Sequence, residues 1–136
     1  MKRLKNIVLS LLLVLALAGC RGSELPAGMD SETLLAAGQD VMLHLVEEEF
    51  EAVYEMLRED QRALFTVEDI SRVVSSQLSG AGEYKQIEKR MTTGSTIDGE
   101  RYGIAVFYCD FSEEDVLVRI SFDAQMQLVG FSLKQD

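Results

Sequence analysis

The sequence is short of the residues that build metal, cofactor and disulfide sites: its 136 residues include one histidine, one proline, two cysteines and no tryptophan. Two cysteines cannot form the disulfide framework that stabilises many small secreted domains. A single histidine leaves no His/Cys cluster with the spacing of a zinc site. A glycine-rich phosphate loop and a Gly-x-Ser-x-Gly nucleophile elbow are also missing. We therefore expect no metal ion and no cofactor.

Charged residues are absent from residues 6–20, although residues 1–5 include three basic ones. Within this stretch, residues 7–18 are apolar apart from one serine. Twelve residues of helix span about 18 Å, whereas the hydrocarbon core of a bilayer is about 30 Å thick. The segment is therefore too short to cross a membrane stably and is typical of a secretory signal peptide.

The end of this segment, Leu17-Ala18-Gly19-Cys20, resembles the bacterial lipobox. The resemblance implies that the Cys20 thiol receives a diacylglycerol, that the chain is cut between Gly19 and Cys20, and that the new amino group is acylated, for example with palmitate. Each buried methylene contributes about 0.8 kcal/mol to membrane affinity, so two or three acyl chains anchor a protein firmly. We predict a lipoprotein signal peptide at residues 1–19 and an extracytoplasmic protein anchored to a bacterial membrane. The alternative is an ordinary signal peptide, or an uncleaved anchor, with an incidental cysteine.

Basic residues are scarce in the rest of the chain. The whole sequence has 13 basic and 23 acidic residues, and residues 1–19 hold three of the basic residues and none of the acidic ones. The mature chain therefore carries ten basic and 23 acidic residues, a formal charge of −13. Such a chain repels nucleic acid and anionic lipid headgroups, so we exclude both as electrostatic partners. We interpret the acidity as a solvated surface, and the alternative is an acidic docking face.

The mature chain divides into two parts. Residues 20–29 contain two glycines and the only proline, which predicts a lipidated tether. The nine residues after Cys20 reach at most about 30 Å when extended. Residues 30–136 are enough for one modest hydrophobic core, so we expect a single domain that is held close to the membrane.

Apolar residues recur with helical spacing three times within residues 30–80. A first helix is predicted from the N-cap Asp30. A second apolar face, within residues 50–57, is rotated by roughly 100° from the first, so we expect a bend or break at residues 47–49. A third helix is predicted from the N-cap Thr66 to Gly80.

The period of apolar residues changes from helical to alternating after residue 82. The second of the resulting strands is apolar on both faces and is expected to lie at the centre of a sheet. Helices followed by strands with short connections are typical of an α+β domain, here with about three helices packed on an antiparallel sheet of about four strands. Asp98-Gly99 is a strong two-residue hairpin turn. The predicted strands are residues 84–96, 101–111, 116–122 and 128–133.

Several short motifs of this domain resemble the bacterial domain-of-unknown-function family 3887. They are FTVEDI at residues 65–70, GEY at 82–84, ISFD at 120–123 and LVGF at 128–131, and the resemblance covers roughly residues 34 to 133. That family is similar to the nuclear transport factor 2-like, or cystatin-like, cone. The resemblance implies a curved sheet that wraps helices and leaves a pocket, but it brings no activity with it.

Four aromatic residues are candidates for lining that pocket: Tyr54, Tyr102, Phe107 and Phe131. The alternative is that these side chains are simply part of the core. Cys109 has no partner cysteine once Cys20 is lipidated. It is either a reactive thiol or a small core residue, and we favour the core.

His44 has Asp40 and Glu48 four residues to either side, which places the three side chains on one helical face. An enzyme uses such an Asp–His pair for proton transfer. The alternative, which we favour, is a solvated histidine between surface carboxylates. The acidic runs at residues 47–49 and 113–115 lack the alternating oxygen ligands of a calcium loop and are interpreted as solvated turns.

The sequence therefore favours a membrane-anchored extracytoplasmic lipoprotein with one non-catalytic, cone-like binding or interaction module at the cell envelope. Its expected partners are the membrane, through the lipid, and an envelope protein or a small apolar ligand. One alternative is a small-molecule enzyme of the isomerase or hydrolase type that uses the cone pocket. A further alternative is a structural homodimer.

Overall fold

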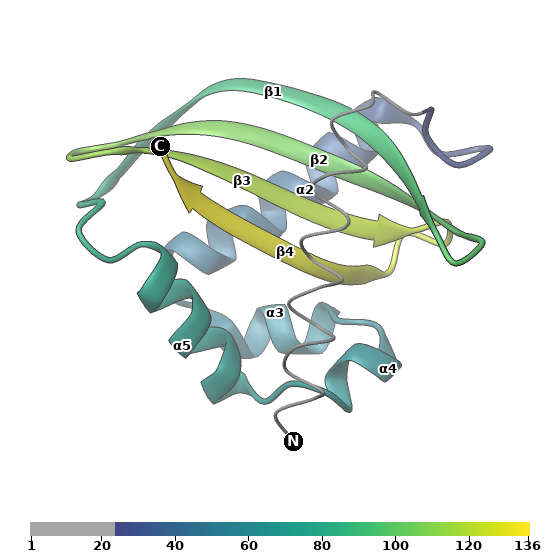
Figure 1. Cartoon of the computed structure of the whole chain (residues 1–136), viewed down its shortest axis with the longest axis horizontal. Coiled ribbons are helices and arrows are strands. Elements are labelled where there is room, and N and C mark those ends of the chain that lie inside the picture. The colour runs from purple at the N-terminus through teal and green to yellow at the C-terminus, as the bar shows by residue number, and fades with distance from the viewer. Residues whose placement is uncertain (1–23) are drawn as a thin grey trace.

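The computed structural model describes residues 24–136, in which four helices are followed by four strands (Figure 1). This confirms the predicted α+β class, and the additional helix is the four-residue α4. The elements are α2 (Ser31–Val46), α3 (Phe50–Met56), α4 (Glu59–Arg62), α5 (Val67–Gln77), β1 (Tyr84–Ile97), β2 (Glu100–Phe111), β3 (Asp115–Asp123) and β4 (Leu128–Gln135).

The predicted signal peptide and the lipidation site, Gly19 and Cys20 included, lie outside the described residues. From residue 24 onward, each helix falls short of the length and apolar character that a membrane span requires.

The helix boundaries follow the predicted signals. The Asp30 carboxylate accepts a hydrogen bond from the backbone N–H of Thr33, which caps α2. Thr66 and Asp69 form a reciprocal capping box at the start of α5. The predicted break at residues 47–49 is also confirmed, because α2 ends at Val46 and α3 begins at Phe50.

The sheet is an open antiparallel meander in the order β1-β2-β3-β4. Its first turn is the predicted Asp98-Gly99 hairpin, where both residues have positive φ angles of 51° and 82°, as a type I′ turn requires. The central position of β2 is confirmed by its pairing with both β1 and β3.

The core lies between the helices and one face of the sheet. On β2, Ala105 and Phe107 face α2, and they pack so closely that they leave room only for glycine at position 38. The alternate β2 residues, Tyr102 and Ile104 among them, belong to a second buried apolar cluster. Because neighbouring strand residues point to opposite faces, this second cluster lies on the sheet face opposite α2.

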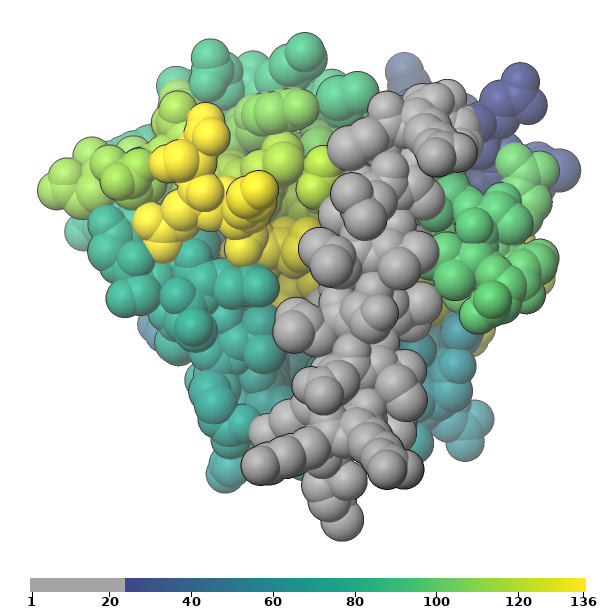
Figure 2. All heavy atoms as spheres, in the orientation of Figure 1, coloured from purple at the N-terminus to yellow at the C-terminus, as the bar shows by residue number. Residues whose placement is uncertain are grey.

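The segment predicted as a tether is partly attached to the domain. Leu25 and Met29 pack against the main core, and Pro26 is buried. Figure 2 shows this segment (purple) next to the β1–β2 hairpin (green) at one end of the molecule. Residues 24–29, which the sequence placed in a tether, are therefore part of the folded domain.

Candidate functional site

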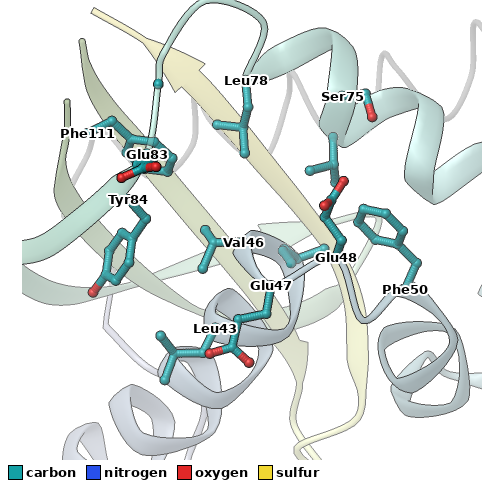
Figure 3. A pocket seen from close by; sticks show the side chains of 13 residues that line it. Leu43, Val46, Glu47, Glu48, Phe50, Ser75, Leu78, Glu83, Tyr84 and Phe111 are labelled. Atoms are coloured by element: carbon teal, nitrogen blue, oxygen red, sulfur yellow. The ribbon is translucent and has the colours of Figure 1, made fainter. Parts of the chain in front are cut away.

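An open groove of about 570 Å³ lies between the end of α2, the start of α3 and α5 (Figure 3). The start of β1 and the end of β2 complete it. Most of its lining side chains are apolar, and three glutamates join them. The lining residues are Leu43, Leu45, Val46, Glu47, Glu48, Phe50, Val74, Ser75, Leu78, Gly82, Glu83, Tyr84 and Phe111.

The break between α2 and α3 forms one side of this groove. The N–H of Glu49 donates to the His44 carbonyl at 2.8 Å, and the N–H of Glu48 donates to the Leu45 carbonyl at 3.3 Å. These two bonds are the pattern of a Schellman helix end, in which one residue adopts the left-handed conformation. Glu48 is that residue, with φ 61°. The turn directs the chain away from α2, so that Phe50 can line the groove.

The loop between α5 and β1 forms the opposite side. The backbone N–H of Glu83 donates to the Ser112 hydroxyl at 2.9 Å, which holds the loop against the β2–β3 turn. Gly82 has φ 85°, and a Cβ there would collide with Ser112. The Tyr84 and Phe111 rings meet edge to face, with centroids 5.7 Å apart. Both walls of the groove are therefore held by specific contacts.

The groove combines an apolar surface with negative charge. Figure 3 shows the Glu48 side chain beside Phe50 and the Glu83 side chain beside Phe111 and Tyr84, on two sides of the groove. Glu83 forms an exposed ion pair with Lys85, whose Nζ lies 3.5 Å from its carboxylate, but the lining itself includes no lysine, arginine or histidine. Burial raises the pKa of the Tyr84 phenol above its ordinary value, so its hydroxyl stays protonated at neutral pH. The arrangement suits a ligand with an apolar body and a positive charge.

Glu48 occupies a backbone conformation that favours glycine. The left-handed region costs a residue with a side chain about 1 kcal/mol, so Glu48→Gly is expected to raise the free energy of unfolding by about 1 kcal/mol. Urea denaturation measures this difference. The matched control is Glu47→Gly, at φ −88°, which gains nothing from glycine. A Glu48→Gly protein no more stable than wild type would contradict the interpretation.

Three of the four predicted pocket aromatics lie in or against the main core, Tyr102 is separated from them, and none of the four lines the groove. Phe107 is fully buried in the main core, whereas Tyr102 belongs to the cluster on the opposite face of the sheet. Tyr54 and Phe131 are partly buried and pack against the main core. A strand places neighbouring side chains on opposite faces, so the even-numbered Tyr102 and the odd-numbered Phe107 of β2 cannot line one cavity.

His44 lies outside the groove lining, beside Asp40 as expected, but its second acidic neighbour is Glu49 instead of Glu48. Its Nδ1 is 2.9 Å from the Glu49 carboxylate, and its Nε2 is 3.8 Å from Asp40. The hydrogen bond from His44 holds the pKa of Glu49 below its ordinary value. Helical spacing pointed to Glu48, but the left-handed turn at Glu48 places Glu49 beside the ring instead.

Cys109 is a core residue, with 1% of its surface exposed. Its Sγ lies 3.4 Å from the Met42 sulfur. Burial, with a smaller effect from Asp110, raises the pKa of the thiol to about 12, so the reactive thiolate does not form near neutral pH. Within residues 24–136, no group of three or more His, Cys, Asp or Glu side chains is arranged to hold a metal ion.

A charged cluster around Arg58 is the polar feature that sequence reasoning missed. The Arg58 guanidinium donates to Asp60 at 2.8 and 2.9 Å, to Glu100 at 2.7 Å and to Asp123 at 3.2 Å. The Arg58 backbone N–H also donates to the Leu128 carbonyl at 2.7 Å. Arg58, the residue just before α4, thereby joins the helices to the start of β2, the end of β3 and the start of β4.

The carboxylates of this cluster accept hydrogen bonds from Arg58 and from donors close to them. Asp123 is almost fully buried, and its second oxygen accepts the backbone N–H groups of Gln125 and Gln127. The Tyr102 hydroxyl donates to Glu100. Arg58, and to a lesser degree Tyr102, lower the pKa of Glu100, while burial and Glu100 raise the pKa of Tyr102 to about 12. These groups are far apart in the sequence, so no local spacing indicated the cluster.

Comparison with known proteins adds a family and a fold. The family described as "Protein of unknown function (DUF3887)" matches residues 39–131, which is more than half of the chain. No curated protein matches. A solved structure, described as the NMR structure of a protein from Ruminococcus gnavus ATCC 29149, is similar with a TM-score of 0.68 and 24% identity. The similarity covers 81% of this chain and 96% of that chain, and it shows the fold alone.

Proposed function

The chain belongs to the DUF3887 family of proteins of unknown function, and we propose that it is a bacterial lipoprotein whose extracytoplasmic domain binds a ligand in the groove. The ligand, a small molecule or a segment of an envelope protein, has an apolar group next to a positive charge. The observation that carries this proposal is the lining of the groove, where apolar side chains are combined with Glu47, Glu48 and Glu83. We further propose a relationship to the nuclear transport factor 2-like cone, which the open antiparallel sheet with helices on one face supports.

The lipid anchor rests on the sequence of residues 1–20, where a basic start and an apolar segment precede Leu17-Ala18-Gly19-Cys20. In cells fed labelled palmitate, Cys20→Ala is expected to abolish the label and to leave uncut precursor, because the thioether needs the thiol. The matched control is Cys109→Ala, which removes the other cysteine of the chain and keeps the label. A normally labelled and processed Cys20→Ala protein would exclude the anchor.

Ligand binding is tested by native mass spectrometry of residues 21–136 purified from the native host. The proposal predicts a bound molecule that remains after gentle desalting and carries a basic group. The same spectrum reports the oligomeric state, so it also tests the alternative of a structural homodimer. A bare monomer, with no ligand gained on incubation with host extract, would argue against the groove as a binding site.

The alternative of an isomerase or hydrolase needs at least two polar or titratable groups that converge on one reacting atom. The carboxylates of the groove stand on different sides of it instead, as Glu48 and Glu83 do (Figure 3). This arrangement supports binding over catalysis. A bound molecule that is converted to a product during incubation would favour the enzyme instead.

A further inference from the structure

The start of the described chain is fixed to one end of the sheet. The Arg101 guanidinium donates to the backbone carbonyls of Glu24 and Leu25 at 3.2 and 3.4 Å. The next residues make a tight turn, in which the N–H of Met29 donates to the Pro26 carbonyl at 3.0 Å. Residue 24 therefore sits beside the first residues of β2.

Apolar contacts hold the same segment in place. Pro26 is buried, and Leu25 and Met29 pack against the main core. The Met29 sulfur lies over Gly103 of β2, so closely that a Cβ at Gly103 would overlap it. This segment was expected to be a free tether, but hydrogen bonds and apolar contacts attach it to the β1–β2 end of the sheet.

The attachment shortens the link to the membrane. If the lipid is attached at Cys20, only residues 21–23 lie between the lipidated residue and Glu24. Four Cα–Cα steps reach at most about 14 Å. A fully free tether of nine residues would reach about 30 Å and would leave the domain free to turn in any direction. The short link instead keeps one end of the sheet at the bilayer surface.

The geometry of the meander identifies that end. Glu100 pairs with Ile97 beside the β1–β2 turn, and Tyr102 pairs with Asp123 beside the β3–β4 turn. Both turns therefore lie at the same end of the sheet as Arg101. The groove residue Phe111 lies ten residues after Arg101 on β2, which is a distance of about 33 Å along the strand. Figure 1 shows the two ends at opposite sides of the molecule.

We propose that the anchored protein is oriented, with the β1–β2 and β3–β4 turns facing the phospholipid bilayer and the groove held at the far end of the sheet, open to the envelope space. This inference rests on the proposed lipidation of Cys20. It means that the groove reaches ligands outside the membrane and does not take lipid from it.

The charged side chains at the membrane end of the sheet do not attract the domain to the bilayer. The Arg58 guanidinium at this end pairs with the carboxylates of Asp60, Glu100 and Asp123, so these carboxylates outnumber the guanidinium groups of Arg58 and Arg101. An anionic bilayer does not attract such a surface. The acyl chains and the short link are therefore responsible for the orientation, and a protein without lipid is expected to stay off vesicles.

The test compares labels at the two ends of the sheet. The full mature lipoprotein is reconstituted in vesicles of phosphatidylglycerol and phosphatidylethanolamine that carry a nitroxide on some headgroups. A thiol-reactive fluorophore is attached at Thr96→Cys, beside the β1–β2 turn, or at Glu114→Cys, in the β2–β3 turn at the other end. Both positions are exposed, whereas Cys109 is buried and shielded from the reagent. We expect nitroxide quenching to be at least threefold stronger at residue 96 than at residue 114.

A mass spectrum of each sample shows first whether the diacylglycerol is present. If the lipid is present and the two labels are quenched equally, the orientation is wrong while the anchor stands. If the lipid is absent, the proposed anchor fails and the orientation fails with it. The double variant Arg101→Met/Leu25→Ser keeps Cys20 but frees the segment, so the lipidated variant should lose most of the difference between the labels. A difference that survives in this variant would overturn the role given to residues 24–29.

Discussion

Arg58→Met is expected to lower the free energy of unfolding by about 3 kcal/mol, because it leaves the buried Asp123 carboxylate without its cation. Breaking a buried ion pair in this way usually costs more than a neutral hydrogen bond, although the backbone N–H groups that Asp123 still accepts limit the loss. The pairs with the more exposed Asp60 and Glu100 are screened by solvent and contribute less than the pair with Asp123. Urea denaturation of residues 21–136 measures the change.

The matched control is Arg72→Met, which removes an exposed ion pair with Asp69 within one helix. Such a pair contributes about 0.5 kcal/mol or less. An Arg58→Met protein within that range of wild type would show that Arg58 does not stabilise the junction of the helices with the sheet.

The pH dependence of stability gives a second measurement on the same variant. Arg58 lowers the pKa of Asp60 and of Glu100 in the folded protein, so the unfolded chain binds their protons more readily. Their contribution to stability is present above the unfolded pKa values, near pH 4, and is lost as the pH falls through the folded values. The Arg58→Met protein should therefore lose less stability than wild type between about pH 5 and pH 2.

Gly38→Ala is expected to destabilise the protein by about 2 kcal/mol, although alanine favours an exposed helix by about 1 kcal/mol over glycine. A Cβ at position 38 would lie 2.5 Å from the Ala105 Cβ and 3.2 Å from the Phe107 ring. The Ala105 Cβ is attached directly to the backbone of β2, so α2 must move away from the sheet to make room. Thermal or urea unfolding measures the loss.

The double variant Gly38→Ala/Ala105→Gly is the control for this explanation. It removes the atom that the new methyl group at position 38 would strike, so part of the lost stability should return, and the two substitutions should not be additive. Strict additivity would mean that the contact between α2 and β2 at these two residues is not the cause.

Local signals in the sequence predicted most of the fold. Asp30 and Thr66 cap their helices, residues 47–49 break the first helical segment, and Asp98-Gly99 forms the first hairpin turn. Each of these features depends on residues within a few positions of one another. The apolar residues on both faces of the second strand also predicted its position inside the sheet.

Features that join distant segments were not predictable in this way. The groove forms where residues near position 47 meet residues near positions 78 and 111, and the Arg58 cluster joins three further segments. Aromatic content pointed to Tyr102 and Phe107 together, but strand alternation separates them onto two faces. Composition alone also made residues 24–29 look like a free tether, because it does not report the contacts with Arg101 and Gly103.

Octylamine and octanoate share an alkyl chain and differ in the sign of their charge, so together they show whether the groove selects an apolar group next to a positive charge. Each is titrated into isotope-labelled residues 21–136, and the amide signals are followed by NMR. We expect octylamine to shift signals at residues 46–50 and 78–84 and octanoate not to shift them. Glu48→Gln should weaken octylamine binding, whereas Asp40→Asn, outside the groove, should leave it unchanged. Equal responses to both compounds, or shifts elsewhere with the groove signals unmoved, would contradict the proposal.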